Sequence, residues 1–356
     1  MIRTLVVLFF LALPLAAQED APHYRALNLG VNGVGVSIGN SRSWTGVRIN
    51  FQDIRVERVT GVGVTIWSPK HNETMTLNGL ALGLAGPVGG RFRGITIGGA
   101  GAVAEESFSG ITIAGFGVVS NGDMHGINIA GLGLVANRDM EWINLAGLGT
   151  VANRSMRGFN VAGLGLVANE DLTGFNVSGL GAVANRNMTG FNFGGLAAVA
   201  NANLSGITFG GLAVVGNGTV AGISAAGMAV VGNRGIKGIA VGGLAVVATG
   251  TLTGIGISAG AVIGEPGIRG IAIGAGHVEG EWINGFAASV IRTRTWDLRG
   301  VSVAGYNRIK GDQRGLTIGI YNYAQRLHGI QLGLINNARN NHGLLRVLPL
   351  INVHLD

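Results

Sequence analysis

Residues 126–141, GINIAGLGLVANRDME, are followed without a gap by 142–157, WINLAGLGTVANRSMR, and by 158–173, GFNVAGLGLVANEDLT. In lines of sixteen, the pattern runs unbroken from Gly94 to Arg269. The period shortens to fifteen residues from Gly270 and to fourteen at Gly315. A fixed period is the signature of a repeat architecture, in which each unit buries its apolar surface against its neighbours.

The spacing of residues within the repeat predicts β-strand. Position 1 is the glycine at 126, positions 2 and 4 are large and apolar, and position 7 is mostly leucine. The alternation at positions 2 and 4 has the period of a strand. Glycine at positions 1 and 6 would cost about 1 kcal/mol each inside a helix. Every repeat is therefore expected to contain strand.

The favoured arrangement is an all-β solenoid with one repeat per coil. Positions 2, 4, 7, 9 and 15 are predicted to face the interior, with corners at positions 5–6, at the glycine of position 1, and at 12–14. Equivalent residues would then stack about 4.8 Å apart. We expect an irregular N-terminal cap at 26–93, a repeat array at 94–284, and shortened repeats with a C-terminal hairpin cap at 285–356.

Stacking of the repeats also predicts rows of asparagine whose amides bond along the axis. Position 3 gives a row of five asparagines: Asn128, Asn144, Asn160, Asn176 and Asn192. Position 12 gives a row of eight: Asn121, Asn137, Asn153, Asn169, Asn185, Asn201, Asn217 and Asn233.

The alternative fold is an antiparallel outer-membrane-type β-barrel with one strand per repeat. Positions 1–12 are long enough for a spanning strand. However, alternate turns of a barrel face opposite sides of a membrane, and here every turn has the same chemistry. The face formed by positions 3, 5, 7, 9 and 11 is also too apolar for the polar interior of a barrel.

The C-terminal segment GLTIGIYNYAQRLHGIQLGLINNARNN (315–341), followed by LPLINVHLD (348–356), resembles a bacterial surface-repeat family. In that family, GxxIGLxN units precede a Pro-containing final strand, and units such as 238–247, GIAVGGLAVV, resemble its body. The resemblance implies an exported, envelope-associated protein without catalytic residues. The chain lacks the lipidation cysteine of lipoprotein members of the family.

The first residues have the features of a secretory signal peptide. Arg3 precedes an apolar run from Leu5 to Leu13, and small residues follow before the acidic pair at 19–20. The run is too short for a membrane-spanning helix. We predict a signal peptide at 1–18 and export to the cell envelope, outer membrane or surface of a bacterium.

Composition excludes several classes of protein. The chain has no cysteine, so disulfides and thiolate metal sites are excluded. Its 65 glycines lack the Gly-X-Y period of collagen. The 25 basic and 18 acidic residues give a net charge of +7. The sequence contains no long run of like charge, so we predict no nucleic-acid partner.

The candidate site is a basic segment at 292–314, which also contains two aromatic residues. It could bind phosphate groups of an envelope lipid or polysaccharide. Its basic residues are Arg292, Arg294, Arg299, Arg308, Lys310 and Arg314.

Candidate catalytic chemistry is limited to His277, Glu279 and Glu281, which alternate and would share one face of a strand. Such residues could bind zinc or serve a carbohydrate-active solenoid enzyme, but a solvated face is favoured because no second ligand cluster accompanies them. We therefore predict no catalytic, metal or cofactor site. The expected function is a non-catalytic scaffold or interaction surface whose partner is an envelope lipid, a polysaccharide or another surface protein.

Overall fold

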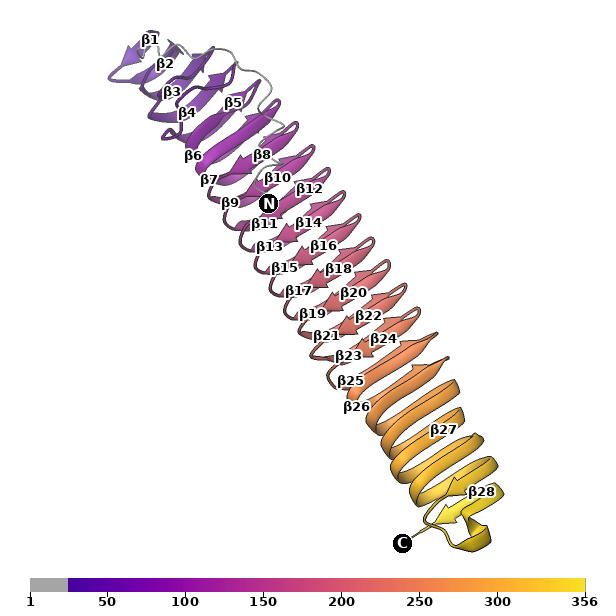
Figure 1. Cartoon of the computed structure of the whole chain (residues 1–356). Helices are drawn as coiled ribbons and strands as arrows, with labels where there is room; N and C mark the ends of the chain where they lie inside the picture. The colour runs from indigo at the N-terminus through magenta and orange to yellow at the C-terminus, as the bar shows by residue number, and fades with distance from the viewer. Residues whose placement is uncertain (1–24, 356) are drawn as a thin grey trace.

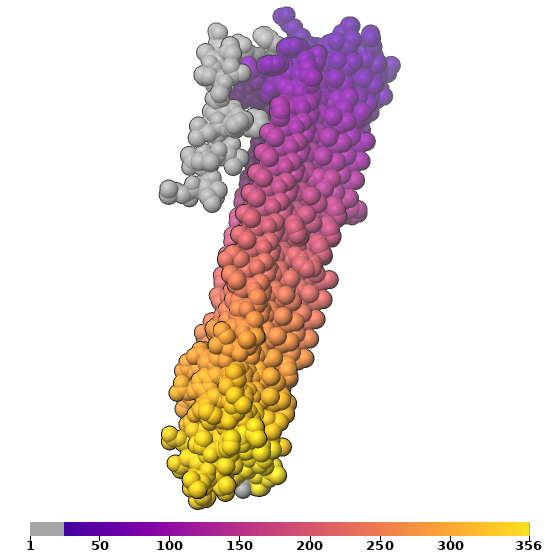
Figure 2. Space-filling model, turned by 90° about the vertical axis from the view of Figure 1, so that its right-hand side faces the viewer, coloured from indigo at the N-terminus to yellow at the C-terminus, as the bar shows by residue number. Residues whose placement is uncertain are grey.

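The chain forms a straight rod of stacked β-coils (Figure 1). The computed structural model describes residues 25–355, and the predicted signal peptide at 1–18 lies outside them. The chain advances along the rod in sequence order, so each segment lies beside segments one coil away (Figures 1 and 2). In the described part of the chain, no helix has the length and hydropathy needed to cross a membrane.

Each sixteen-residue repeat forms one coil with a long and a short strand, such as β13 (Met156–Ala162) and β14 (Gly165–Ala168). Long strands cover positions 15 to 5 and pair in parallel with long strands of adjacent coils, which places Phe159 opposite Phe175. Short strands cover positions 8 to 11 and pair with short strands. The predicted solenoid is confirmed. The barrel alternative is wrong, because equivalent residues of consecutive repeats lie side by side in parallel strands.

We call the two layers the long-strand sheet and the short-strand sheet. The long strands of the central repeats are β9 (Asp123–Ala130), β11 (Met140–Ala146), β13, β15 (Leu172–Ser178), β17 (Met188–Gly194), β19 (Leu204–Gly210), β21 (Thr219–Ala226), β23 (Gly235–Gly242) and β25 (Leu252–Ser258). The short strands are β8 (Gly117–Ser120), β10 (Gly133–Ala136), β12 (Gly149–Ala152), β14, β16 (Gly181–Ala184), β18 (Ala197–Ala200), β20 (Ala213–Gly216), β22 (Ala229–Gly232) and β24 (Ala245–Ala248).

The stacking continues on both sides of the central repeats. The N-terminal strands are β1 (Ala26–Val31), β2 (Val34–Gly39), β3 (Ser43–Asn50), β4 (Arg58–Thr65), β5 (Thr76–Gly83), β6 (Val88–Gly98) and β7 (Gly101–Ala114). The C-terminal elements are β26 (Ala261–Gly274), β27 (His277–Ala338), the 3-10 helix η2 (Gly343–Arg346) and β28 (Val347–His354). β27 winds continuously through several coils (Figure 1).

The interior of the rod is formed by positions 3, 5, 9, 11 and 15. In one central coil these residues are Asn160, Ala162, Leu166, Ala168 and Leu172, and each is at most 2% exposed. Positions 9 and 15 face inward as predicted. Positions 2, 4 and 7 face outward, so the predicted interior is wrong at these three positions.

The phase of the strand alternation explains part of this difference. Gly158 has a φ of +112°, and equivalent glycines along the rod share the positive value. At Gly158 the long strand bends, so positions 16, 1 and 2 all lie outside between the buried positions 15 and 3. Positions 15 and 3 are four residues apart, so the inward–outward alternation keeps its phase through the bend, and the even-numbered positions 2 and 4 stay outside.

The narrowness of the interior also explains why the large side chains of positions 2 and 4 face outward. At Gly194, which occupies position 5, an added Cβ would lie 2.0 Å from the carbonyl oxygen of Ala197. Positions 5 and 11 are accordingly alanine, glycine or serine in the central coils, and position 15 carries the large side chain. A coil this thin has no room for the phenylalanine and isoleucine of positions 2 and 4.

Asparagines form two hydrogen-bonded rows along the rod. At position 12, each Nδ2 from Asn137 to Asn233 donates to Oδ1 of the preceding asparagine at 2.7–3.0 Å, and these side chains are exposed. At position 3, each Nδ2 from Asn128 to Asn176 donates to Oδ1 of the next asparagine at 2.8–2.9 Å. The second row is fully buried, so neighbouring amides replace water as hydrogen-bond partners.

Antiparallel strands cover both ends of the described rod. β1 pairs with β2, and β28 pairs with the last turn of β27. Near the N-terminal end, the buried guanidinium of Arg48 donates to Oδ1 of Asp53 at 2.6 Å, and the hydroxyl of Thr65 donates to Oδ2 of the same carboxylate at 2.6 Å. These contacts give the first coils a polar core in place of an apolar one.

Candidate interaction surface

The outer side of the long-strand sheet carries two parallel rows of apolar side chains. Cross-strand partners in a sheet point to the same side, so the register places position 2 of every coil in one row and position 4 in another. All these residues are at least partly exposed, with Phe159 at 42%. We call these two rows together the apolar face.

Neither row contains a polar or charged residue along the rod. The position 2 row consists of Val36, Val47, Val62, Leu80, Ile95, Ile111, Ile127, Ile143, Phe159, Phe175, Phe191, Ile207, Ile223, Ile239, Ile255, Ile271, Phe286, Val301, Leu316 and Ile330. The position 4 row consists of Ile38, Ile49, Val64, Leu82, Ile97, Ile113, Ile129, Leu145, Val161, Val177, Phe193, Phe209, Ala225, Val241, Ile257, Ile273, Ala288, Val303, Ile318 and Leu332.

The apolar face also extends onto the end strands. Leu29 and Leu27 of β1 lie opposite Val36 and Ile38. At the other end, β28 places Val353 opposite Ile330 in the same way. The apolar face therefore runs the whole length of the described rod, although the core beneath it changes from asparagine to alanine and threonine.

A row whose charged residues are mainly basic flanks the apolar face at position 16, on the other side of the position 1 glycines, and most of its other members are serine, threonine, alanine or asparagine. Between residues 93 and 314, its single acidic member is Glu141, whose carboxylate is bound by Arg157 and His125 at 3.2 Å each. We call this the flanking row. Its basic members are Arg93, Arg157, Lys237, Arg269, Arg299 and Arg314.

The short-strand sheet has a different outer surface. Position 10 is valine from Val103 to Val247 and isoleucine at Ile263, and the register then places Glu279 next in the row. Position 7 forms an exposed leucine row at the turn between the two sheets, with Leu164 at 47% exposure. These rows are apolar only in the central coils, in contrast to the apolar face.

The six basic residues predicted as one anion site lie on different parts of the rod. Arg292 and Arg294 point outward from the side of the short strands, where their guanidinium groups lie 3.9 and 3.4 Å from the carboxylate of Glu279. Arg308 lies between the buried Asn307 and Ile309 and also points outward.

The remaining three basic residues lie elsewhere. Arg299 and Arg314 precede the position 1 glycines and belong to the flanking row, whereas Lys310 lies near the polar turn that carries Asp312. The structure thus joins part of the sequence-predicted segment to a longer basic row, which sequence proximity did not reveal.

His277 and Glu279 lie on the outer side of the coil that follows β26, opposite Ala261 and Ile263. Glu281 is exposed at the start of the next turn. Among residues 25–355, no group of three histidine, cysteine or acidic residues lies close enough to hold a metal ion. Glu279 instead faces the two arginines of the next coil.

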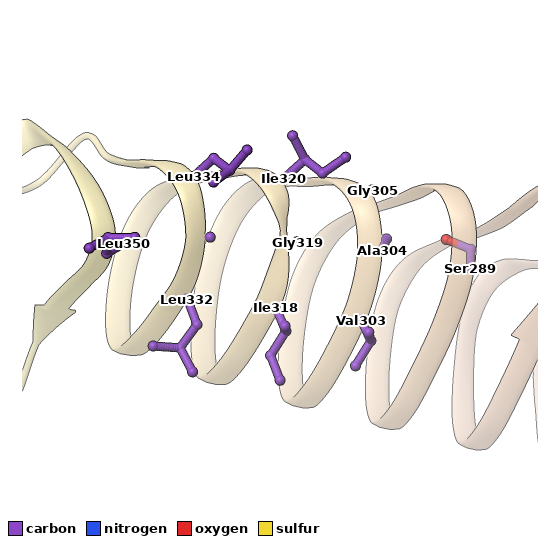
Figure 3. Close-up of a pocket in the computed structure, with 11 residues that line it drawn as sticks. Ser289, Val303, Ala304, Gly305, Ile318, Gly319, Ile320, Leu332, Leu334 and Leu350 are labelled. Atoms are coloured by element: carbon purple, nitrogen blue, oxygen red, sulfur yellow. The ribbon is translucent and has the colours of Figure 1, made fainter.

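A shallow apolar groove of about 550 Å³ adjoins the C-terminal end of the apolar face. Figure 3 shows Val303, Ile318 and Leu332 pointing to one side of it, and Ile320 and Leu334 to the other. Its floor consists of small residues of position 5, which leave the backbone uncovered. The groove is continuous with the position 4 row and belongs to the same apolar surface.

Trp142 is the exception among the position 1 residues. It replaces the glycine found there in the neighbouring coils, keeps a positive φ of +85°, and is 69% exposed. A bulky residue in this conformation carries strain of about 1–3 kcal/mol. Its ring stands between the flanking row and the apolar face.

No protein-family model matches the chain, and no match was found among curated proteins or solved structures. The resemblance of the C-terminal segment to a bacterial surface-repeat family therefore stays a prediction.

Proposed function

We propose that the protein is an exported, non-catalytic repeat protein of the bacterial envelope that acts as a scaffold or interaction surface. The observation that supports this proposal is the apolar face, whose rows from Val36 to Leu332 point away from the core. Burial of large apolar side chains stabilises a fold, yet these forty positions contribute little to the core of a single chain. A continuous exposed apolar surface of this extent is typical of a binding face.

The rigidity of the rod supports the same function. Consecutive coils are joined by parallel ladders in both sheets and by the two asparagine rows. Such an array holds its outward side chains at a fixed spacing of about 4.8 Å. A rigid, regularly spaced surface suits the display of many weak contacts at once, so affinity comes from their number.

The test is envelope retention of the full-length chain expressed in a bacterium. We expect removal of residues 1–18, visible by mass spectrometry, and recovery of the mature chain with the envelope fraction. Replacement of Phe159, Phe175 and Phe191 by serine should release the folded chain into the soluble exported fraction. An uncleaved chain in the cytoplasm would contradict export, and unchanged retention of the serine variant would contradict the role of the apolar face.

A further inference from the structure

We propose that the apolar face binds the surface of an anionic lipid layer, with the long axis of the rod parallel to the layer. This inference rests on the proposed function, because it names the partner of the same surface. The side chains of positions 2 and 4 enter the acyl region, and the cations of the flanking row remain at the level of the lipid phosphates.

The length of the apolar face favours a lipid layer over a protein partner. At about 4.8 Å per strand, the rows from Val36 to Ile330 extend for roughly 90 Å. A width of about 10 Å then gives on the order of 900 Å², beyond the roughly 300–600 Å² of the largest apolar patch on a typical monomer. A continuous layer covers a straight strip of this length without needing a matching length of partner.

The charge beside the apolar face favours an anionic partner over a second copy of the chain. The flanking row has six basic residues and one acidic residue between 93 and 314, and that acidic residue, Glu141, is already paired with Arg157. A second copy would bring the same basic row to the interface. Lipid phosphates instead provide acceptors for arginine and lysine, and Arg299 and Arg314 from the predicted anion segment contribute to this set.

The distribution of polar groups around the coil fits a rod that lies on the layer. The turn at positions 12–14 carries the exposed asparagine row together with most of the charge of the central repeats, including Arg154, Arg186 and Asp139. This turn is separated from the apolar face by the flanking row. An apolar side bordered along one edge by cations, with a polar turn beyond them, matches the pattern of interfacial binding.

Trp142 occupies the boundary that the proposal predicts. Its side chain is 69% exposed and lies at position 1, between Glu141 of the flanking row and Ile143 of the apolar face. Tryptophan combines a large apolar ring with one N–H donor, and it is enriched where hydrocarbon meets headgroups. Binding there accounts for a strained tryptophan where the adjacent coils have glycine.

The first experiment measures flotation of the purified chain with vesicles. We expect binding to vesicles of phosphatidylcholine mixed with phosphatidylglycerol, and weaker binding to phosphatidylcholine alone. The triple variant Phe159→Ser, Phe175→Ser, Phe191→Ser should lose at least about tenfold in affinity, equivalent to about 1.4 kcal/mol. The matched control, Leu164→Ser, Leu180→Ser, Leu196→Ser in the leucine row, removes comparable apolar side chains and should retain binding.

Two further variants test the contribution of the basic flanking row and the depth to which Trp142 enters the lipid. Lys237→Gln with Arg269→Gln should reduce binding to the anionic vesicles and leave binding to phosphatidylcholine unchanged. Tryptophan emission should shift to shorter wavelength and be quenched by acyl-brominated lipid, and Trp142→Phe should remove most of that response. Circular dichroism of every variant establishes that the fold is retained.

The outcomes separate the lipid partner from the proposed function. If vesicles do not bind but sedimentation shows a dimer that the phenylalanine variant dissociates, the lipid proposal is overturned and the interaction surface stands. If the wild-type chain is monomeric and binds no vesicles, the lipid proposal is overturned, and unchanged envelope retention of the phenylalanine variant would overturn the proposed function too. Equal loss of vesicle binding in the leucine control would refute the assignment of binding to the apolar face.

Discussion

At the scale of single residues, the glycine that opens each coil lies close against the backbone of the preceding coil. An added Cβ at Gly158 would lie 2.1 Å from the carbonyl oxygen of Trp142 in the preceding coil, and the φ of Gly158 is +112°. Both the contact and the conformation exclude a side chain without a local shift. Trp142 keeps the positive φ without being glycine, so it stores strain that glycine would not.

We therefore expect Trp142→Gly to raise the free energy of unfolding by about 1 kcal/mol, because the strain of a positive φ is relieved. Gly158→Ala should lower it by about 2 kcal/mol or more, because the added Cβ meets backbone. Urea unfolding followed by circular dichroism measures both changes. A destabilised glycine variant would mean that the indole makes contacts worth more than the strain.

A second residue-scale prediction concerns the buried ion pair of the N-terminal coils. Arg48→Ala removes the cation that lies 2.6 Å from the buried Asp53 and leaves that carboxylate without its charged partner. We expect a loss of about 3–5 kcal/mol in the free energy of unfolding. The matched control is Arg42→Ala, which breaks an exposed ion pair with Glu57. This substitution should change the free energy of unfolding by less than about 1 kcal/mol.

A third prediction concerns acid stability near the C-terminal end. The hydrogen bond from Arg326 lowers the pKa of Asp312 below its ordinary value near 3.8, and the charges of Arg326, His328 and Arg314 add to this. A depressed pKa in the folded state contributes stability that is present at neutral pH and lost as the pH falls through the folded value.

Arg326→Gln should accordingly reduce stability at pH 7 and reduce the further loss on acidification below the ordinary carboxyl range. Urea unfolding of both proteins across that range measures the difference, which isolates Asp312 from other carboxyl groups. If the free energy of unfolding varies with pH in the same way in the two proteins, the ion pair of Arg326 and Asp312 contributes nothing to the pH dependence of stability.

At the scale of elements, the two asparagine rows have the same bonding pattern but different surroundings. Asn160 is fully buried, accepts from Asn144 and donates to Asn176, whereas Asn169 in the position 12 row is exposed. Removal of a buried amide leaves partners that water cannot reach, and removal of an exposed amide does not.

We expect Asn160→Ala to lower the free energy of unfolding by about 2–5 kcal/mol, because a donor and an acceptor are left unsatisfied in the core. Asn169→Ala should cost less than about 1 kcal/mol, because water replaces the lost amide. Chemical unfolding of the two variants gives the comparison. Equal costs would show that the rows act through stacking geometry alone.

At the scale of the whole molecule, the rod is a one-dimensional array in which each coil contacts its neighbours. Deletion of 158–189, which spans two complete repeats, brings Arg157 directly before Gly190 and preserves every register. We expect a folded, shorter rod with the same secondary structure by circular dichroism and a smaller hydrodynamic radius.

A deletion of 158–165 removes half a repeat and is the matched control. It would set the long strand of one coil beside the short strand and the polar turn of the next, so we expect it to prevent folding of the central coils. A folded half-repeat deletion would contradict the requirement for register.

The sequence alone favoured the coil over the barrel, because every turn of the gapless sixteen-residue period has the same chemistry. The same period placed the eight asparagines from Asn121 to Asn233 in one row. It did not determine which side of each strand is buried. Positions 2 and 4 are the most apolar of the repeat, and burial of apolar surface normally decides orientation.

Only the tertiary structure decided the orientation of the side chains and the extent of the apolar face. The inward side chains all lie at odd-numbered positions of the repeat, and the narrow core admits Asn160 and Ala162 but excludes Phe159. The flanking row from Arg93 to Arg314 likewise depends on the stacking of coils of sixteen and fifteen residues. These features arise from the packing of each coil against the next, which no single repeat encodes.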